Sequence, residues 1–144
     1  MYDFPFVSII APVYNGEKTV SVLLSSLLEQ DYPKDKLEIL IVDNNSRDLS
    51  RQIIAGFPVK LLDETMVQSS YAARNRGIRS AQGEIFAFID SDCRANPDWV
   101  KKGVNALLNE GADLAGGKVE FIFSNRPQLQ RYMIRSLILM LRRA

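Results

Sequence analysis

Two aspartates, Asp90 and Asp92, flank Ser91 directly after the apolar run 84–89, which reads as a buried strand. Residues two apart in extended backbone point to the same side, so the two carboxylates would lie ~6–7 Å apart and repel each other. A divalent cation beside them would relieve that repulsion, and oxygen ligands favour Mg²⁺ or Mn²⁺ over zinc. The pattern alone is also typical of a solvated loop, but its place after a buried strand favours a metal site.

The composition excludes several other kinds of site. The 144 residues include no histidine and one cysteine, Cys93. A His-based zinc site, a Ser-His-Asp triad and an internal disulfide are therefore excluded, and we expect a reducing compartment. The net charge of +1 gives no indication of a nucleic-acid partner. The chemistry must therefore rest on carboxylates, hydroxyls, arginines, lysines or a hard metal ion.

Strands and helices are predicted to alternate along the chain. Apolar, β-branched segments predict strands over 7–13, 37–42, 59–62, 84–89 and 114–123. Helical spacing and caps predict helices over 17–30, 46–56, 69–82 and 97–111, with Ser46 and Asn96 as N-caps. Continuous apolar strands suit a parallel sheet that is covered on both faces. We therefore expect an α/β fold, a Rossmann-like and mostly parallel sheet flanked by helices.

Polar clusters follow three of these strands, at the edge where such sheets bind ligands. The first, 12–17, has neither the G-x-G-x-x-G fingerprint nor a Walker A loop. The second begins at Asp43, which either caps a turn or accepts hydrogen bonds from a base or ribose. On the third predicted helix, Arg74 and Arg76 diverge by about 200°, so one can face a ligand while the other faces solvent. The residues alone do not choose between these two arginines.

The segments 7–15, 41–48, 73–77, 81–84 and 88–92 resemble, in this order, the sequence blocks of family 2 glycosyltransferases. The resemblance covers about residues 7–117, although Asn44 departs from the common Asp-Asp-Gly-Ser form of the second block. It implies the nucleotide-sugar-binding portion of a GT-A fold. It also implies transfer, with inversion, of a sugar from a nucleoside diphosphate, as in the synthesis of cell-envelope polysaccharides.

The resemblance also implies residue roles. Pro12, Tyr14 and Glu17 would line the nucleotide pocket, and Asp43 would bind the base. Arg74, rather than Arg76, would help to hold the nucleotide. Asp90 would bind ribose or metal-bound ligands, and Asp92 would ligate the divalent metal, Mn²⁺ or Mg²⁺.

A general base for inverting transfer is not identifiable in the sequence. After Asp98 the carboxylates are Glu110, Asp113 and Glu120, and none matches the family's catalytic acid block. We therefore expect a truncated chain whose residues 1–124 form a donor- and metal-binding domain. We expect this chain to bind the donor rather than to carry out the complete sugar transfer alone.

Residues 125–144 are predicted to form an amphipathic helix. Its apolar stripe would consist of Leu129, Tyr132, Met133, Leu137, Met140 and Leu141, with arginines beside it. Such a helix either packs on this domain or on downstream sequence, or contacts a second copy or an anionic membrane surface. Neither a signal peptide nor a membrane span is predicted, so we expect a cytoplasmic protein with peripheral membrane contact as one alternative.

Two other functions fit parts of the pattern. A sugar-phosphate nucleotidyltransferase would usually have a glycine-rich, basic loop after the first strand, whereas loop 12–17 contains one glycine and no arginine. A non-catalytic nucleotide-sugar-binding module that dimerises through residues 127–144 is the other alternative.

Overall fold

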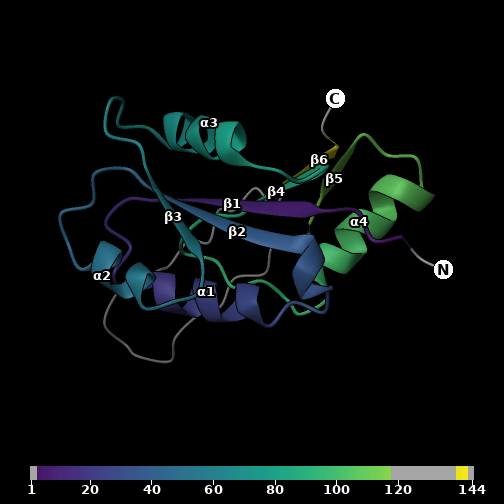
Figure 1. Ribbon diagram of the computed structural model, residues 1–144, viewed down its shortest axis with the longest axis horizontal. Coiled ribbons are helices and arrows are strands. Elements are labelled where there is room, and N and C mark those ends of the chain that lie inside the picture. The colour runs from purple at the N-terminus through teal and green to yellow at the C-terminus, as the bar shows by residue number, and fades with distance from the viewer. Residues whose placement is uncertain (1–2, 118–138, 143–144) are drawn as a thin grey trace, which may run out of the picture.

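The computed structural model describes residues 3–117 and the backbone of residues 139–142. The described strands form one six-stranded sheet in the order β3-β2-β1-β4-β6-β5 (Figure 1). They are β1 (Val7–Val13), β2 (Leu37–Asp43), β3 (Lys60–Asp63), β4 (Ile85–Phe88), β5 (Leu114–Gly116) and β6 (Leu139–Arg142). The helices are α1 (Val20–Leu28), α2 (Ser50–Ala55), α3 (Ser70–Ser80), α4 (Trp99–Asn109) and the short 3₁₀ helix η1 (Lys34–Lys36).

The first four strands of that order, β3, β2, β1 and β4, are parallel to one another, whereas β6 is antiparallel to both β4 and β5. The predicted α/β fold with a mostly parallel sheet is therefore confirmed. Sequence order runs outward from β1 in two directions, to β2 on one side and to β4 on the other. This reversal creates a crevice at the carboxyl ends of β1 and β4, where open α/β sheets bind ligands.

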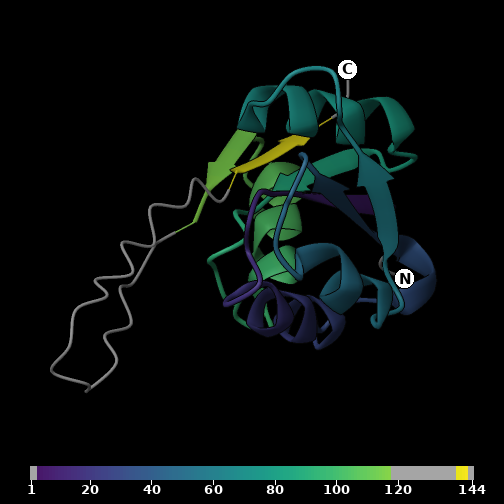
Figure 2. The ribbon, with the colours of Figure 1, turned by 90° about the vertical axis from the view of Figure 1, so that its left-hand side faces the viewer.

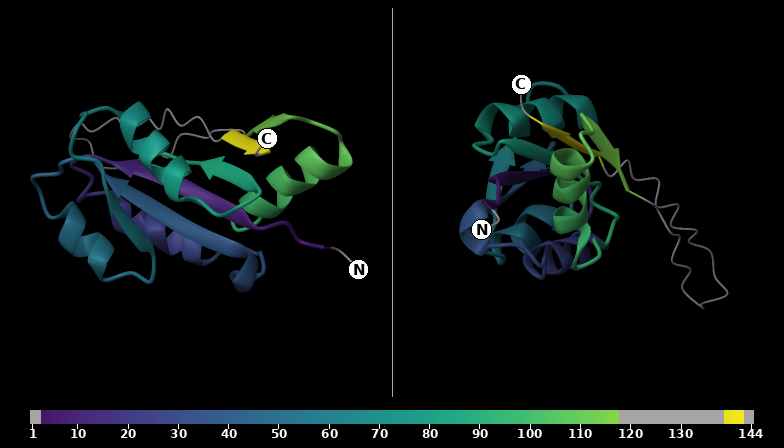
Figure 3. Two further views of the ribbon diagram at one scale, coloured as in Figure 1. Left: turned by 45° about the horizontal axis from the view of Figure 1, so that its top comes forward. Right: turned by 90° about the vertical axis from the view of Figure 1, so that its right-hand side faces the viewer.

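The helices cover both faces of the sheet. Helix α3 lies on one face, and α1, α2 and α4 lie on the other (Figures 1 and 2). Alternate strand residues face opposite sides, so Ile9 and Ile41 join the larger core cluster while Ile10 and Leu40 join the smaller one. Helices α2 and α4 lie toward opposite ends of the molecule (Figure 3).

Helix α3 packs closely on the sheet at Gly77, where no side chain separates the helix from the strands. A Cβ at this position would meet Cγ2 of Ile10 at 2.6 Å and Cγ2 of Val42 at 3.3 Å. The helix begins with a side-chain cap, since the Oγ of Ser69 accepts from the N–H of Ala72 at 3.0 Å. This close packing fixes the position of Arg74 relative to the ends of the strands.

Two predicted N-caps were wrong. Ser46 does not begin α2, which starts four residues later with Leu49 as its N-cap and no side-chain cap. The hydroxyl of Ser46 instead accepts a hydrogen bond from the N–H of Asn15 in the loop after β1. Ser46 therefore belongs to the loop after β2, and the helix begins beyond it. Similarly, α4 starts at Trp99 with Asp98 at the N-cap, and Asn96 contributes only its carbonyl to a preceding turn.

The helix predicted at the C-terminus is contradicted at residues 139–142, which form β6. A short continuous apolar run fits either a helix or a buried strand, and here the backbone pairs with strands on both sides. The remaining residues of that prediction, the dimer or membrane contact through 127–144 and the later part of the predicted strand 114–123 lie outside the described residues. Within the described part of the chain, every helix is too short or too polar to cross a bilayer.

Candidate functional site

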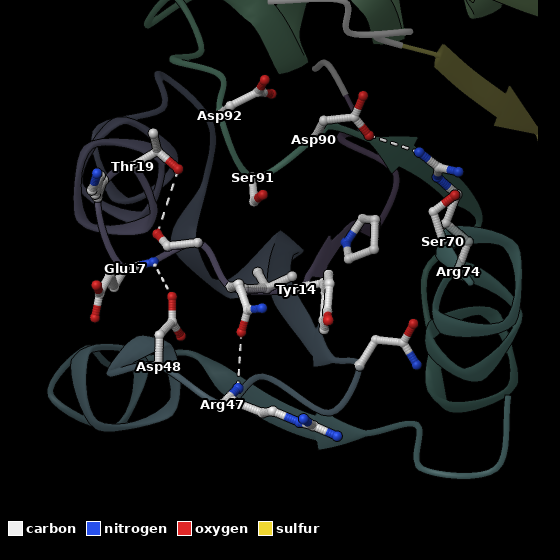
Figure 4. A pocket seen from close by; sticks show the side chains of 16 residues that line it. Tyr14, Glu17, Thr19, Arg47, Asp48, Ser70, Arg74, Asp90, Ser91 and Asp92 are labelled. Atoms are coloured by element: carbon white, nitrogen blue, oxygen red, sulfur yellow. Dashed lines mark hydrogen bonds and ion pairs between the residues drawn. The ribbon is translucent and has the colours of Figure 1, made fainter. Parts of the chain in front are cut away.

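A pocket of about 940 Å³ opens at the carboxyl ends of the central strands (Figure 4). Six residues predicted to bind nucleotide or metal line it: Pro12, Tyr14, Glu17, Arg74, Asp90 and Asp92. Ten further residues complete the lining: Val13, Asn15, Gly16, Lys18, Thr19, Asn44, Arg47, Asp48, Ser70 and Ser91. The pocket therefore joins the loops after β1, β2 and β4 to the first turns of α3.

Arg74 and Asp90 form an ion pair across the pocket wall, from Nη2 to Oδ1 at 2.7 Å (Figure 4). Both side chains are about one quarter exposed, so the pair is partly shielded from solvent. The other candidate arginine, Arg76, does not line the pocket and bonds to Ser80 on its own helix. The structure thus brings Arg74, and not Arg76, to the site.

Asp92 is the second carboxylate of the pair around Ser91. Its pKa is raised by burial and by the negative charge of Asp90, although a weak contact from the Cys93 thiol acts in the opposite direction. Within residues 3–117 and 139–142, no group of three or more His, Cys, Asp or Glu side chains could hold a metal. A divalent cation at Asp92 would therefore need water or substrate oxygens as further ligands, which is how Mg²⁺ sites are commonly completed.

The loops after β1 and β2 are joined by hydrogen bonds. The N–H groups of Asn15 and Gly16 donate to the hydroxyls of Ser46 and Ser50, at 2.9 and 2.8 Å. In the reverse direction, the N–H of Arg47 donates to Oδ1 of Asn15 at 2.8 Å. These bonds fix the wall of the pocket that Tyr14 and Arg47 share.

Two carboxylates take part in the same network. Oδ2 of Asp48 accepts from the N–H of Glu17 at 3.1 Å, and Oε2 of Glu17 accepts from the N–H of Leu49 at 3.0 Å. Burial acts to raise the pKa of Asp48, but bonds from Ser50 and Glu17 outweigh it, so the pKa lies below its ordinary value. Glu17 thus lines the pocket while its carboxylate is bonded to the protein backbone.

Asparagines at both loops adopt the left-handed backbone conformation. Asn15 has φ 49° and Asn45 has φ 64°. Asparagine tolerates this conformation better than most residues because its short amide can bond locally. Tyr14, next to the first of these turns, is 50% exposed and presents its ring to the pocket (Figure 4).

Asp43, predicted to bind the base, does not line the pocket. Its side chain is 2% exposed, and Oδ2 accepts from the N–H of Ser46 at 3.2 Å and faces Nη1 of Arg51 at 3.5 Å. Arg51 also pairs with Asp63 at the end of β3. The other oxygen, Oδ1, is buried without a hydrogen-bond partner among the described residues, which is energetically costly for a carboxylate.

Several lining residues were missed by the sequence interpretation, notably Asn44, Arg47 and Asp48. Arg47 and Asp48 fall in the segment that was interpreted as the start of a helix, whereas Asn44 precedes it in the polar cluster after the second strand. Residues 44–48 instead form a loop, partly held by the side-chain amide of Asn44, which donates to the carbonyls of Glu64 and Val67 at 2.9 Å each. Their position directly after a strand of a parallel sheet was the available signal.

Residues 8–143 match the family model Glycosyl transferase family 2. The chain belongs to this family. It is 43% identical over 126 residues to glycosyltransferase AglE of Haloferax volcanii, covering 84% of this chain and 41% of that protein. It is 36% identical over 108 residues to the poly(ribitol-phosphate) beta-N-acetylglucosaminyltransferase TarS of Staphylococcus aureus, covering 72% of this chain and 19% of that protein.

Solved structures agree with this assignment. The S. aureus TarS 1–349 structure matches with a TM-score of 0.72 and 26% identity, over 95% of this chain and 47% of that one. The Pyrobaculum calidifontis mannosyltransferase PcManGT, in complex with GDP-Man and Mn²⁺, matches with a TM-score of 0.71 and 30% identity, over 76% and 34%. The chain thus spans less than half the length of these relatives.

Proposed function

We propose that this chain is the donor-binding portion of a metal-dependent, inverting glycosyltransferase that uses a nucleoside-diphosphate sugar. The observation that carries the proposal is the pocket at the point where strand order reverses, with the Arg74–Asp90 ion pair and Asp92 on one wall. A divalent cation at Asp92, with Asp90 beside it, would supply positive charge to a diphosphate leaving group.

Two structural relatives support the class of donor. PcManGT was solved with GDP-Man and Mn²⁺, and S. aureus TarS 1–349 was solved with UDP-GlcNAc. Both ligands are nucleoside-diphosphate sugars. A pocket of about 940 Å³ is within the range that holds a ligand of this size.

Different residues of the pocket would contact different parts of such a donor. Arg74 would hold the Asp90 carboxylate in place and add positive charge near the phosphates. The exposed ring of Tyr14 would stack against the nucleoside, and Pro12 would form the floor beside it. Glu17 would act through the loop that it holds, because its carboxylate already bonds to the backbone.

Asp43 remains a candidate for binding the base. Its buried Oδ1 lacks a partner, and a base N–H would satisfy it. Since this oxygen is enclosed, the surrounding side chains would have to shift to admit a base. Asn44, the next residue, already lines the pocket, so the pocket wall lies one residue away from Asp43.

Inverting transfer needs a base that takes the proton of the acceptor. Glu110 and Asp113 do not line the pocket, and Glu120 lies outside the described residues. We therefore assign donor binding, and not the role of general base, to the described residues.

Thermal unfolding with nucleotides and Mn²⁺ tests the proposal. UDP or GDP with Mn²⁺ should raise Tm, because a ligand at 100 times its Kd stabilises the folded state by about 2.7 kcal/mol. Asp92→Ala should remove the contribution of Mn²⁺, whereas Asp113→Ala, at an exposed aspartate outside the pocket, should not. An unchanged Tm with every nucleotide and metal would contradict the proposal.

A further inference from the structure

Arg47 is a cation of the pocket that neither the sequence interpretation nor the proposed function uses. It lies in the loop between β2 and α2, and its side chain is exposed. Its backbone is fixed, because its N–H donates to Oδ1 of Asn15 at 2.8 Å. The guanidinium therefore projects from a rigid anchor.

The acidic side chains near Arg47 bond elsewhere. Asp48 accepts from Ser50 and from the N–H of Glu17, and Glu17 accepts from the N–H of Leu49. Asp90, which lies across the pocket from Arg47 in Figure 4, is paired with Arg74. Over residues 3–117, where side chains are described, the guanidinium of Arg47 takes part in none of the ion pairs. A pocket cation without an acidic partner has its five N–H donors available for a ligand.

The position of Arg47 in the pocket indicates which part of a donor it would meet. In Figure 4, Arg47 and Asp92 lie on opposite sides of the pocket, with Tyr14 between them. If the diphosphate lies at Asp92 and the nucleoside stacks on Tyr14, the nucleobase extends toward Arg47. The guanidinium would then meet a base edge instead of a phosphate.

We propose that Arg47 binds the nucleobase of the donor and selects a base with a carbonyl oxygen on its exposed edge. This inference rests on the proposed function. Arginine only donates hydrogen bonds, and uracil and guanine offer carbonyl oxygens, to which arginine can bind in a planar arrangement. Adenine offers an amino group at the corresponding edge, and that group would face the N–H donors of Arg47.

Calorimetric titration of the chain with UDP, GDP and ADP, each with Mn²⁺, tests this inference. The wild type should bind UDP or GDP more tightly than ADP. Arg47→Met keeps the length and apolar stem of the side chain but removes its donors, and should weaken the preferred nucleotide by about 10- to 100-fold. Its affinity for ADP should change by less than about threefold, so the preference should largely disappear.

Two controls separate this role from others. Arg47→Lys keeps the charge but loses the planar fork, and should recover only part of the preference. Arg79→Ala, at an exposed arginine of α3 that does not line the pocket, should change neither affinity nor preference. The Tm of each variant without ligand should stay near that of the wild type, because the Arg47 side chain is exposed.

The possible results distinguish the inference from the proposed function. Equal weakening of UDP, GDP and ADP by Arg47→Met would mean a phosphate contact and would overturn the inference. Unchanged affinities, or a wild type that prefers ADP, would also overturn it while leaving donor binding intact. A wild type that binds no nucleotide would overturn the proposed function itself.

Discussion

The carboxylate of Asp48 accepts a hydrogen bond from the backbone N–H of Glu17 at 3.1 Å, across two loops that are 31 residues apart in sequence. The carboxylate of Glu17 in turn accepts a hydrogen bond from the backbone N–H of Leu49, the residue after Asp48, at 3.0 Å. The two acidic residues thus hold the β1 and β2 loops together. These two carboxylates therefore stabilise the pocket wall through bonds to the backbone.

Replacement of Asp48 by asparagine should destabilise the chain. Oδ1 accepts from both the N–H and the hydroxyl of Ser50, and Oδ2 accepts from Glu17, so an amide nitrogen in either place would meet a donor. We expect the free energy of unfolding in urea to fall by about 1–3 kcal/mol at pH 7. Glu17→Gln is the matched control, since one oxygen is enough for Leu49, and it should cost less than about 0.5 kcal/mol.

The Asp48 effect should depend on pH. Its folded pKa is lowered, so its charged form contributes stability above the unfolded pKa, and this stability is lost as pH falls through the folded pKa. The difference between the wild type and Asp48→Asn should therefore shrink when urea unfolding is repeated below about pH 4. A constant difference down to pH 2 would show that the charge of Asp48 is not the cause.

Loss of Arg74 should weaken the binding of nucleotide without weakening the binding of Mn²⁺ alone. Arg74→Ala removes the partner of Asp90 and increases the negative charge next to Asp92. We expect UDP or GDP with Mn²⁺ to bind about tenfold more weakly, since one charge-assisted contact is lost, while Mn²⁺ alone binds no more weakly than before. Calorimetry on both ligands measures this, and Arg76→Ala on the same helix should leave both within about twofold.

Gly83 should not tolerate a side chain. A Cβ there would lie 2.6 Å from the backbone nitrogen of Ser8 and 2.9 Å from the carbonyl of Phe6, and backbone atoms cannot move aside cheaply. Gly83→Ala should therefore lower the free energy of unfolding by about 1–3 kcal/mol or more in urea. Gly116→Ala, where nothing lies within 4 Å, is the control; equal effects at both positions would contradict the steric explanation.

Tyr32 should make stability fall in alkaline solution. Its hydroxyl donates to the carbonyl of Pro5 at 2.6 Å, and burial, with a smaller effect of the Glu84 charge, raises its pKa to about 12. The pKa of Tyr32 in the folded chain lies above its unfolded value of about 10. The protonated hydroxyl therefore contributes its full stabilisation below pH 10, and this contribution is lost as pH rises through about 12. The loss approaches about 2.7 kcal/mol.

The Tyr32→Phe variant isolates that loss. At pH 8 it should be less stable than the wild type by about 1 kcal/mol, because the bond to Pro5 is missing. Urea unfolding at pH 8, 10 and 11 should show the advantage of the wild type shrinking as pH rises. An advantage that does not change with pH would contradict the raised pKa.

Much of the fold could be predicted because local patterns determine it. The continuous apolar runs at β1 and β2 indicated buried parallel strands, and Asp90 and Asp92 followed such a strand directly. The alternation of strands and helices then placed the polar loops at one edge of the sheet. The arginine of α3 came instead from family resemblance, since helical geometry alone left two candidates.

Other features depend on contacts that no local pattern reveals. Ser46 has the chemistry of a helix cap, but the loop after β1 binds its hydroxyl, and this tertiary contact delays the start of α2. Asp48 and Arg47 were therefore assigned to a helix that begins later. The strand at 139–142 was likewise predicted as helix, because its apolar run is compatible with both structures and only its partners decide.

The position of β6 between β4 and β5 has a consequence for how the sheet is completed. Strand β5 pairs with no other described strand, so it cannot join the sheet until residues 139–142 are in place. During synthesis, which proceeds from the N-terminus, β5 emerges before β6 and stays unpaired until β6 has been made. Until then β4, which leads into Asp90, has an open hydrogen-bonding edge that could pair with another chain. Among the described strands, the edge of the sheet beside the acidic wall of the pocket is therefore the last to be paired, and until then it is open to misassembly.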